Sequence, residues 1–473
     1  MNNQQTTQHI TGWPHKLYHN ITKTLTEDWR TNTYYPFAVI LFILTTLLVV
    51  VYYINHPKPE LYLDTGEYLS QVQLIQTHWQ IVDPHRVPGF PLLITLIFAL
   101  SGQGNVMAVS IVHAMLFVLS TLEIYVIALI VLRRAWIAFL VGLLVGTNIS
   151  LLTFVKPILS ETLSLWLAVS LALAAVLFVH TSRVRHLWIA AAFAIALFMT
   201  RAEWIYLPLP LFAYLILAAV RHGSATRRLL FHALASVALI YAILGGYIYI
   251  NATQYNYLGV ADTQNFNAWG KVIQYGMQNE APPQYAMVTQ ITNKFRSQGG
   301  LNPYNLVQQY PLLASDHYSL VGDYAKSIIQ KHPVEFIEKS VPVAFSSLPD
   351  FYYESQIDPQ GPFGSTLLKV QSAYQLLYKM NMLFPMCAVA WIFLLFWRRT
   401  ARLRTVHAMG AIILLVLYGV IITTLGGFAS YPRYHTPFNP LLIIIIWGSL
   451  LAAIQLIVYY RPRIIARIAR QPL

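Results

Sequence analysis

Charged residues and cysteine are scarce in this 473-residue sequence. Only 10% of the residues are Asp, Glu, Lys or Arg, whereas 56% are hydrophobic and the mean hydropathy is +0.52. Soluble domains carry about 25% charged residues, so this composition excludes a soluble globular protein and indicates an integral membrane protein. The single cysteine, Cys387, excludes an intrachain disulfide and a thiolate metal cluster.

The charge is strongly unbalanced, with 31 Lys and Arg residues against 18 Asp and Glu residues, a net charge of +13. In a membrane protein such an excess reflects topology, so we expect no nucleic-acid partner. The first 30 residues are polar and lack both an apolar core and a small-residue cleavage site. We therefore expect that no signal peptide is removed.

The apolar runs predict about ten transmembrane helices. The eleven apolar runs lie at 35–54, 90–101, 105–132, 135–152, 158–180, 187–200, 204–220, 229–250, 379–397, 406–425 and 437–460. The run at 90–101 reaches only about 18 Å as a helix, too short for a hydrocarbon core of about 30 Å. If it lies along the surface, most Lys and Arg residues of the short loops fall on one face, which is then cytoplasmic together with both termini. The runs at 187–200 and 204–220 are either two crossings or a re-entrant pair.

These boundaries divide the chain into five parts. They are a cytoplasmic N-terminal segment (1–34), a transmembrane module (35–250) with an external loop (55–104), an external domain (251–375), C-terminal transmembrane helices (376–460) and a basic cytoplasmic tail (461–473). The external domain is too long to be a structureless loop, and we expect a small α or α+β fold. Within it, 323–340 predicts a helix interrupted at His332-Pro333, and the aromatic alternation at 255–273 is typical of a strand.

The first external loop carries the densest polar pattern. Leu61-Tyr-Leu-Asp64-Thr-Gly-Glu67-Tyr68 is followed by Leu69, Val72, Ile75 and Trp79 on one helical face, then by Arg86-Val-Pro-Gly-Phe-Pro. The apolar face predicts a helix lying flat in the membrane interface, with Asp64 and Arg86 at its surface. Asp64 and Glu67 also match a capping box, with Asp64 as the N-cap.

In this arrangement the sequence resembles the lipid-phosphate-sugar-dependent glycosyltransferases of the glycosyltransferase-C (GT-C) superfamily, which contains the protein O-mannosyltransferases and aminoarabinose transferases. The matching elements are Asp64 with Tyr68 after the first transmembrane helix, Arg86 in a proline-containing segment, Ser160-Glu161 opening a helix, Thr200-Arg201 at a helix exit and Arg433-Tyr434 in the last external loop. The sequence departs from the mannosyltransferases in having Asp-Thr rather than Asp-Glu in the first loop.

The resemblance implies a membrane-embedded catalytic module that transfers a monosaccharide from a polyprenyl-phosphate donor to an acceptor hydroxyl, with inversion, at the external face. Asp64 would act as the general base, and Arg86, Arg201 and Arg433 would bind the leaving phosphate. The other candidate substrate-binding residues are Tyr68, Glu161, Glu67 and Lys156. The implied partners are the lipid-linked sugar donor, membrane lipids and an acceptor glycan, lipid or protein. The implied location is the plasma (inner) membrane if the source is prokaryotic.

Other interpretations stay open. A polytopic transporter or lipid flippase is the main alternative function. Arg201 with Glu203 suits a structural ion pair, and Arg86 suits an interfacial anchor. Glu161 suits the first turn of a helix by dipole complementarity. Glu123 and His113 are expected to make interhelical hydrogen bonds. Asp262, Trp269 and Tyr275 are candidates for sugar contacts, and Asn251-Ala-Thr253 matches a glycosylation acceptor. Asp64 with Glu67, and Asp83 with His85, are too few ligands to favour a metal site, so we expect no cofactor.

Overall fold

The computed structural model describes residues 34–300, 302–350, 357–397, 400, 402–428 and 431–468. The predicted N-terminal segment and the end of the basic tail lie outside these ranges, as do Arg398 and Arg399. The described residues are almost entirely helical and contain no strand, only an isolated parallel bridge between Glu60 and Pro157.

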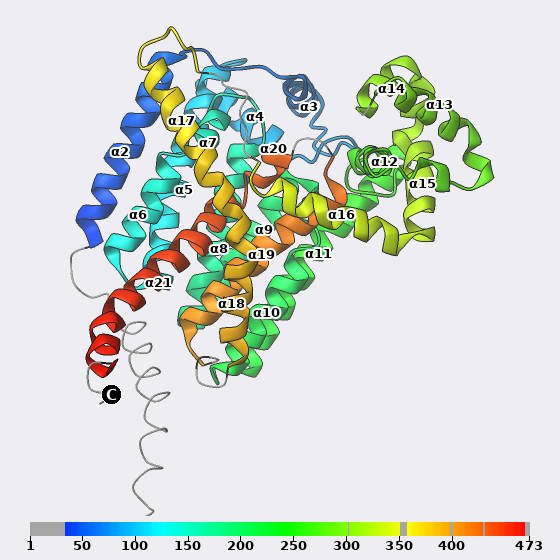
Figure 1. The fold of residues 1–473 in the computed structure, drawn as a ribbon. Coiled ribbons are helices and arrows are strands. Elements are labelled where there is room, and N and C mark those ends of the chain that lie inside the picture. The colour runs from blue at the N-terminus through cyan, green and yellow to red at the C-terminus, as the bar shows by residue number, and fades with distance from the viewer. Residues whose placement is uncertain are drawn as a thin grey trace, which may run out of the picture.

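A bundle of helices forms the larger part of the molecule (Figure 1). The bundle helices are α2 (Tyr34–Asn55), α5 (Val106–Leu132), α6 (Ala135–Gly146), α7 (Ile149–Leu152), α8 (Glu161–Thr181), α9 (Val184–Thr200), α10 (Pro208–Arg221), α11 (Arg227–Tyr255), α17 (Gly364–Tyr378), α18 (Phe384–Phe396), α19 (Arg404–Gly426) and α21 (Asn439–Ile468). Three shorter helices, α3 (Leu63–His78), α4 (Gly89–Ser101) and α20 (Tyr431–His435), gather at one end of the bundle, here called the site end (Figure 1).

The chain is an all-α polytopic membrane protein. Six helical segments in the described ranges are long and apolar enough to cross a membrane, and counting the bent pair α6 and α7 as one span gives seven. The helices α4, α9 and α10 and the described first part of α21 are also apolar but shorter. All ten apolar runs expected to cross are therefore helical, while the number that cross stays a prediction. The runs at 187–200 and 204–220 form two separate helices.

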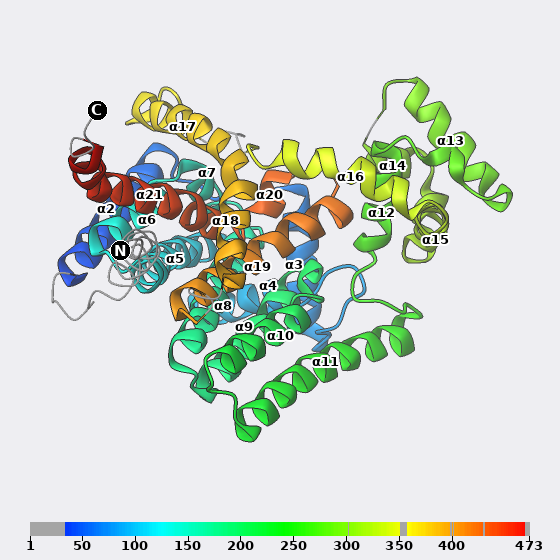
Figure 2. The ribbon, with the colours of Figure 1, turned by 60° about the horizontal axis from the view of Figure 1, so that its bottom comes forward.

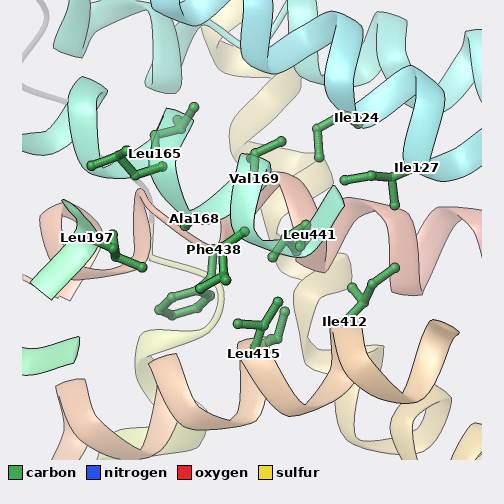
Figure 3. Packing of buried hydrophobic residues seen from close by; sticks show 14 of the residues in the cluster. Ile124, Ile127, Leu165, Ala168, Val169, Leu197, Ile412, Leu415, Phe438 and Leu441 are labelled. Atoms are coloured by element: carbon green, nitrogen blue, oxygen red, sulfur yellow. The ribbon is translucent and has the colours of Figure 1, made fainter. Parts of the chain in front are cut away.

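The bundle core is packed around α8. Of the most apolar part of this helix 83% is buried, against 22% for α2, so α8 is central and α2 peripheral. Its Ala and Ser residues let neighbouring helices approach closely, which matters because lipid provides no hydrophobic driving force between helices. Leu165, Ala168 and Val169 of α8 pack against side chains of α5, α9, α19 and α21 and against Phe438, which precedes α21 (Figure 3). The other labelled residues are Ile124, Ile127, Leu197, Ile412, Leu415 and Leu441.

A second, smaller unit projects from the site end and is here called the protruding domain (Figures 1 and 2). It consists of α12 (Thr263–Gln274), α13 (Ala286–Ser297), α14 (Pro303–Gln309), α15 (Ser315–Lys331) and α16 (Pro333–Ser347). Its core is separate from that of the bundle and contains Trp269, Leu306 and Tyr324. The helix break expected at His332-Pro333 is confirmed, because α15 ends at Lys331 and α16 begins at Pro333.

The structure corrects two expectations about this region, the strand and the exposed glycosylation acceptor. The strand expected at 255–273 is wrong, since α11 continues to Tyr255 and α12 starts at Thr263. The alternating aromatics instead divide between the bundle surface and the protruding-domain core. Within the predicted 251–375 unit, α17 packs on the bundle, where the Tyr374 hydroxyl donates to the Leu144 carbonyl at 2.8 Å. Asn251 is fully buried and donates to the Gly259 carbonyl at 2.8 Å, so it is no exposed glycosylation acceptor.

The apolar face of α3 also lies differently from the prediction. Val72 and Ile75 are 1% and 5% exposed, so this face packs into the protein rather than into the interface. Trp79 does not share this buried face, because it ends α3 in a left-handed conformation and is 83% exposed. The helix is therefore fixed to the site end by packing. On α4, Leu92, Leu96 and Leu100 remain exposed at four-residue spacing, which gives that helix an outward apolar stripe.

Candidate active site

The start of α3 determines where Asp64 points. The helix begins at Leu63, and the backbone N–H of Tyr62 donates to Thr65 Oγ1 at 2.9 Å. Thr65 rather than Glu67 therefore closes the capping box, and the prediction that Asp64 is the N-cap is wrong. As a first-turn residue, Asp64 has its carboxylate free to reach cations from other segments, while the helix dipole favours its charged form.

A rigid loop brings Arg86 to the same helix. Asp83 Oδ1 accepts the backbone N–H groups of His85 and Arg86 at 2.7 and 3.2 Å. Gln71 of α3 donates to the carbonyl oxygens of Ile81 and Arg86 at 3.3 and 3.2 Å. These bonds fix the loop against α3, and the Arg86 guanidinium stands 5.3 Å above the Tyr68 ring.

Arg433 joins two carboxylates that are far apart in sequence. Its Nη2 donates to Asp64 Oδ2 at 2.8 Å, and its Nε donates to Glu161 Oε1 at 2.7 Å. Glu161 is the first residue of the central helix α8 and is 1% exposed. Glu161 therefore lies at a helix N-terminus, as the dipole interpretation predicts, and also contacts the arginines, while its role in substrate binding stays a prediction.

Arg201 completes the buried part of the cluster. Arg201 caps the C-terminal end of α9 and is 9% exposed, and its Nη1 lies 3.5 Å from Glu161 Oε1. Its Nε donates to Glu203 Oε1 at 2.5 Å, so the expected pairing with Glu203 is confirmed. The Arg201 guanidinium also stands 5.2 Å from the Tyr434 ring. Two arginines thus meet at one oxygen of Glu161.

On the other side of Asp64, the cluster extends to the protruding domain. Arg86 Nη2 lies 3.3 Å from Asp64 Oδ1 and 2.5 Å from Glu67 Oε2. Glu67 Oε2 is in turn 3.3 Å from His85 Nε2, and His85 Nδ1 is 2.7 Å from Asp262 Oδ1. The loop and the protruding domain are therefore tied together by ionisable groups.

These contacts form one continuous chain of alternating charge, here called the charge chain. It runs from Glu203 through Arg201, Glu161, Arg433, Asp64, Arg86, Glu67 and His85 to Asp262. Its members come from α3, α8 and α20, from the loop before α4, and from the residues that directly follow α9 and directly precede α12. The Tyr68 hydroxyl packs beside it and donates to Ser160 Oγ at 3.2 Å.

The charge chain shifts the ionisation of its members. Burial opposes the charged form of Asp64, but Arg433 and Arg86 outweigh burial and lower the Asp64 pKa. Burial likewise opposes the charged form of Glu67, but His85 and Arg86 lower its pKa. Burial also opposes protonation of His85, but hydrogen bonds to Asp262 and Glu67 raise its pKa to about 9. At neutral pH all three side chains are therefore charged.

Seven of the eight predicted site residues lie in or against the charge chain, and Lys156 does not. Lys156 is fully buried, with Nζ 4.6 and 4.8 Å from the centres of the Tyr52 and Tyr53 rings. From the sequence, His85 was paired with Asp83 as weak metal ligands and Asp262 was named as a candidate sugar contact, but His85 was not paired with Asp262. The two residues are 177 positions apart, so no local pattern indicates their contact.

Several other predicted roles are settled by burial. Trp269 is 0% exposed in the protruding-domain core, so its proposed stacking on sugar is wrong. Tyr275 is 8% exposed and its hydroxyl donates to the Thr424 carbonyl at 3.2 Å. Glu123 makes the expected interhelical hydrogen bonds, accepting from Ser170 at 2.8 Å and Trp166 at 3.3 Å.

A metal site needs several His, Cys, Asp or Glu side chains close together. Among the described residues, no group of three or more His, Cys, Asp or Glu side chains could hold a metal ion. In the predicted Asp83 and His85 pair, Asp83 binds backbone N–H groups, while the His85 ring turns to Glu67 and Asp262. The expectation that no metal is required stays a prediction.

No family model and no curated protein matches the chain. Among solved structures, it is similar to the archaeal oligosaccharyltransferase AglB from Archaeoglobus fulgidus in complex with an inhibitory peptide and a dolichol-phosphate, with a TM-score of 0.48 and 12% identity over 92% of this chain and 52% of that one. The apo form of the A. fulgidus oligosaccharyltransferase gives a TM-score of 0.46 and 13% identity over 94% and 54%. The form tethered to an acceptor peptide with the NVT sequon gives 0.48 and 13% over 92% and 52%. The chain thus spans about half the length of these structures.

Proposed function

We propose that the protein is a GT-C-type membrane glycosyltransferase, which moves a monosaccharide from a polyprenyl-phosphate donor to an acceptor hydroxyl at the external membrane face. The observation that carries this proposal is the convergence of Arg86, Arg201 and Arg433 on Asp64 and Glu161 at the site end. Planar guanidinium groups match phosphate oxygens bidentately, and a carboxylate between them is placed to accept a proton.

The reaction follows from the groups present. The acceptor oxygen bonds to the anomeric carbon on the face opposite the phosphate, the bond from that carbon to the phosphate oxygen breaks, and the configuration inverts. The hydroxyl proton passes to Asp64, and the polyprenyl phosphate leaves with the bonding electron pair. Because the Asp64 pKa is lowered, Asp64 is a carboxylate before reaction, which is the form that accepts a proton.

The arginines supply fixed positive charge where negative charge grows on the phosphate. Their charge is compensated by Asp64, Glu67, Glu161 and Glu203. A donor phosphate must therefore compete with these carboxylates for the arginine side chains. This competition favours a ligand that binds several guanidinium groups at once. Arg433 is central to this competition because it binds both Asp64 and Glu161.

The test is release of polyprenyl phosphate from a short-chain polyprenyl-phosphate sugar, followed by mass spectrometry, with the product's anomeric configuration determined by NMR. The wild type should release lipid phosphate and form an inverted glycoside, while Arg433→Gln should be severely impaired. Lys326→Gln is the matched control, since it removes one positive charge from a side chain that is 56% exposed in the protruding domain. Movement of the intact donor across a bilayer without cleavage would instead support the flippase alternative.

A further inference from the structure

A polar cavity adjoins the charge chain but is not explained by phosphate binding. It has a volume of about 320 Å³ and is lined by Gly66, Glu67, Ser70, Gln71, Leu74, Asp83, His85 and Arg86. This volume is in the range of small-molecule sites, roughly 300 to 1,000 Å³. The cavity shares Glu67 and Arg86 with the charge chain, and Arg86 Nη2 also reaches Asp64 Oδ1 at 3.3 Å.

Gln71 gives the cavity an unmet hydrogen-bond requirement. This residue is 3% exposed, and its amide nitrogen donates to two backbone carbonyl oxygens, of Ile81 and Arg86. Because carbonyl oxygens only accept, the amide must be oriented with its nitrogen toward them. Gln71 Oε1 is left buried, and no donor within the described residues reaches it. A ligand in the cavity that Gln71 lines can donate to this acceptor after a small rotation of the amide side chain, because Oε1 itself has almost no accessible surface.

The other cavity groups favour a ligand of the same type. Every contact that holds Glu67 uses Oε2, so Oε1 can accept a further hydrogen bond. The Ser70 side chain is exposed on the same face of α3. The lining charges balance, since Glu67 and Asp83 are opposed by Arg86 and the protonated His85. A neutral ligand rich in hydroxyl groups satisfies these acceptors without adding charge to a balanced site.

We infer that this cavity is the acceptor subsite of the proposed transferase and that the acceptor is a neutral saccharide. Gln71 and Asp64 lie seven residues apart on α3, about 10 Å along the helix axis. A short saccharide covers this span, with hydroxyl groups donating to Gln71 and Glu67 at one end and the reacting hydroxyl near Asp64 at the other. The inference rests on the proposed function for the role of acceptor, but not for the binding of sugar.

Gly66 allows the cavity to be filled without disturbing the fold. A Cβ at this position meets no atom within 4 Å, and the residue lies inside α3, where a larger side chain favours the helix. Gly66→Leu therefore introduces a side chain into open space beside the cavity. Gln73→Leu is the matched control, because Gln73 is exposed on the same helix and does not line the cavity.

The probes are methyl glucoside, methyl mannoside and methyl galactoside as neutral sugars, glucosamine as a cation and glucuronate as an anion. Binding to the full-length protein in a sugar-free detergent is measured by saturation-transfer NMR. At least one neutral sugar should bind, about tenfold or more weakly to Gly66→Leu than to the wild type and Gln73→Leu. Binding of charged probes alone, no binding at all, or equal binding to both leucine variants would overturn the inference.

Donor turnover in the same preparations separates this inference from the proposed reaction. Intact donor cleavage without saccharide binding overturns the acceptor subsite only. Saccharide binding that Gly66→Leu weakens, together with no donor cleavage by the wild type, overturns the proposed reaction and leaves a sugar-binding cavity.

Discussion

The three arginines should not contribute independently to turnover, because two of their three pairings share a carboxylate. Arg86 and Arg433 hold opposite oxygens of Asp64 at 3.3 and 2.8 Å. Arg201 and Arg433 share Glu161 Oε1 at 3.5 and 2.7 Å. Arg86 and Arg201 share no carboxylate in the described part of the chain, so this pair is an internal control. The perturbation is the set of three single and three double Arg→Gln variants.

The magnitude follows from desolvation. Loss of one partner from a desolvated charge pair costs about 2 to 5 kcal/mol, which corresponds to a fall in kcat/KM of roughly 30- to 5,000-fold. Arg433→Gln should lie at the upper end, because it leaves both Asp64 and the 1% exposed Glu161 short of a partner. A solvent-exposed charge such as Lys326 should matter by less than about 1 kcal/mol.

The double variants show whether the arginines act together or independently. The Arg86 with Arg433 and Arg201 with Arg433 pairs should show coupling energies above about 0.5 kcal/mol, whereas Arg86 with Arg201 should be additive within about 0.5 kcal/mol. The assay is kcat/KM for release of polyprenyl phosphate, with the melting temperature of each variant measured to identify unfolding. Equal coupling in all three pairs would show that the arginines couple through one shared ligand rather than through Asp64 and Glu161, and additive losses below about 1 kcal/mol in all three pairs would refute a shared phosphate site.

Three further results are expected. The pKa of His85 in the folded protein, about 9, lies above its ordinary value of 6.5, so protonated His85 stabilises the fold fully below pH 6.5 and this contribution of roughly 1 to 3 kcal/mol is lost as pH rises through 9. The melting temperature of the wild type should fall between pH 6.5 and 9, and that of His85→Gln should change less. Parallel curves for the two proteins would contradict the assignment. Glu67→Gln should reduce turnover by about tenfold, less than loss of the base, since it removes a hydrogen-bonded charge from Arg86 without touching Asp64; a loss as large as that of Asp64→Asn would make Glu67 a candidate base. In a Cys387→Ser background, a cysteine at residue 103 should be labelled from outside and one at residue 134 should be protected, whereas labelling from the same side at both would exclude the ten-helix topology.

The helical architecture could be predicted because it depends on local pattern. A bilayer favours apolar helices, and every apolar run in the sequence is helical, although α4, α9 and α10 are shorter than a full span. The failures occurred where two signals compete. The alternation at 255–273 matched a strand, but Trp269 and Phe266 both turn into the core of a helical domain. The apolar stripe through Val72 and Ile75 was correctly assigned to a helix, but it was expected to face the membrane interface and instead packs against protein. Periodicity shows that a helix face is apolar, not whether lipid or protein covers it.

Most residues of the candidate site could be predicted from the sequence, but the contacts between them could not. Asp64, Arg86 and Arg433 stand out because charges are costly near hydrocarbon. That Arg433 would reach Asp64 across 369 residues of sequence could not be inferred without the fold that brings α20 beside the start of α3. The role of His85 was missed for the same reason, since its partner Asp262 lies 177 residues away.

The most direct test of the proposed chemistry is turnover of a short-chain polyprenyl-phosphate sugar by Asp64→Asn. Asparagine retains the shape of the side chain but accepts no proton, and it competes less strongly with phosphate for Arg433 and Arg86. Donor binding should therefore be at least as tight as in the wild type, while kcat should fall by about 100-fold or more, the usual contribution of a general base. Near-normal kcat in Asp64→Asn with normal donor binding would remove Asp64 from the mechanism and contradict the proposed role of the charge chain in glycosyl transfer.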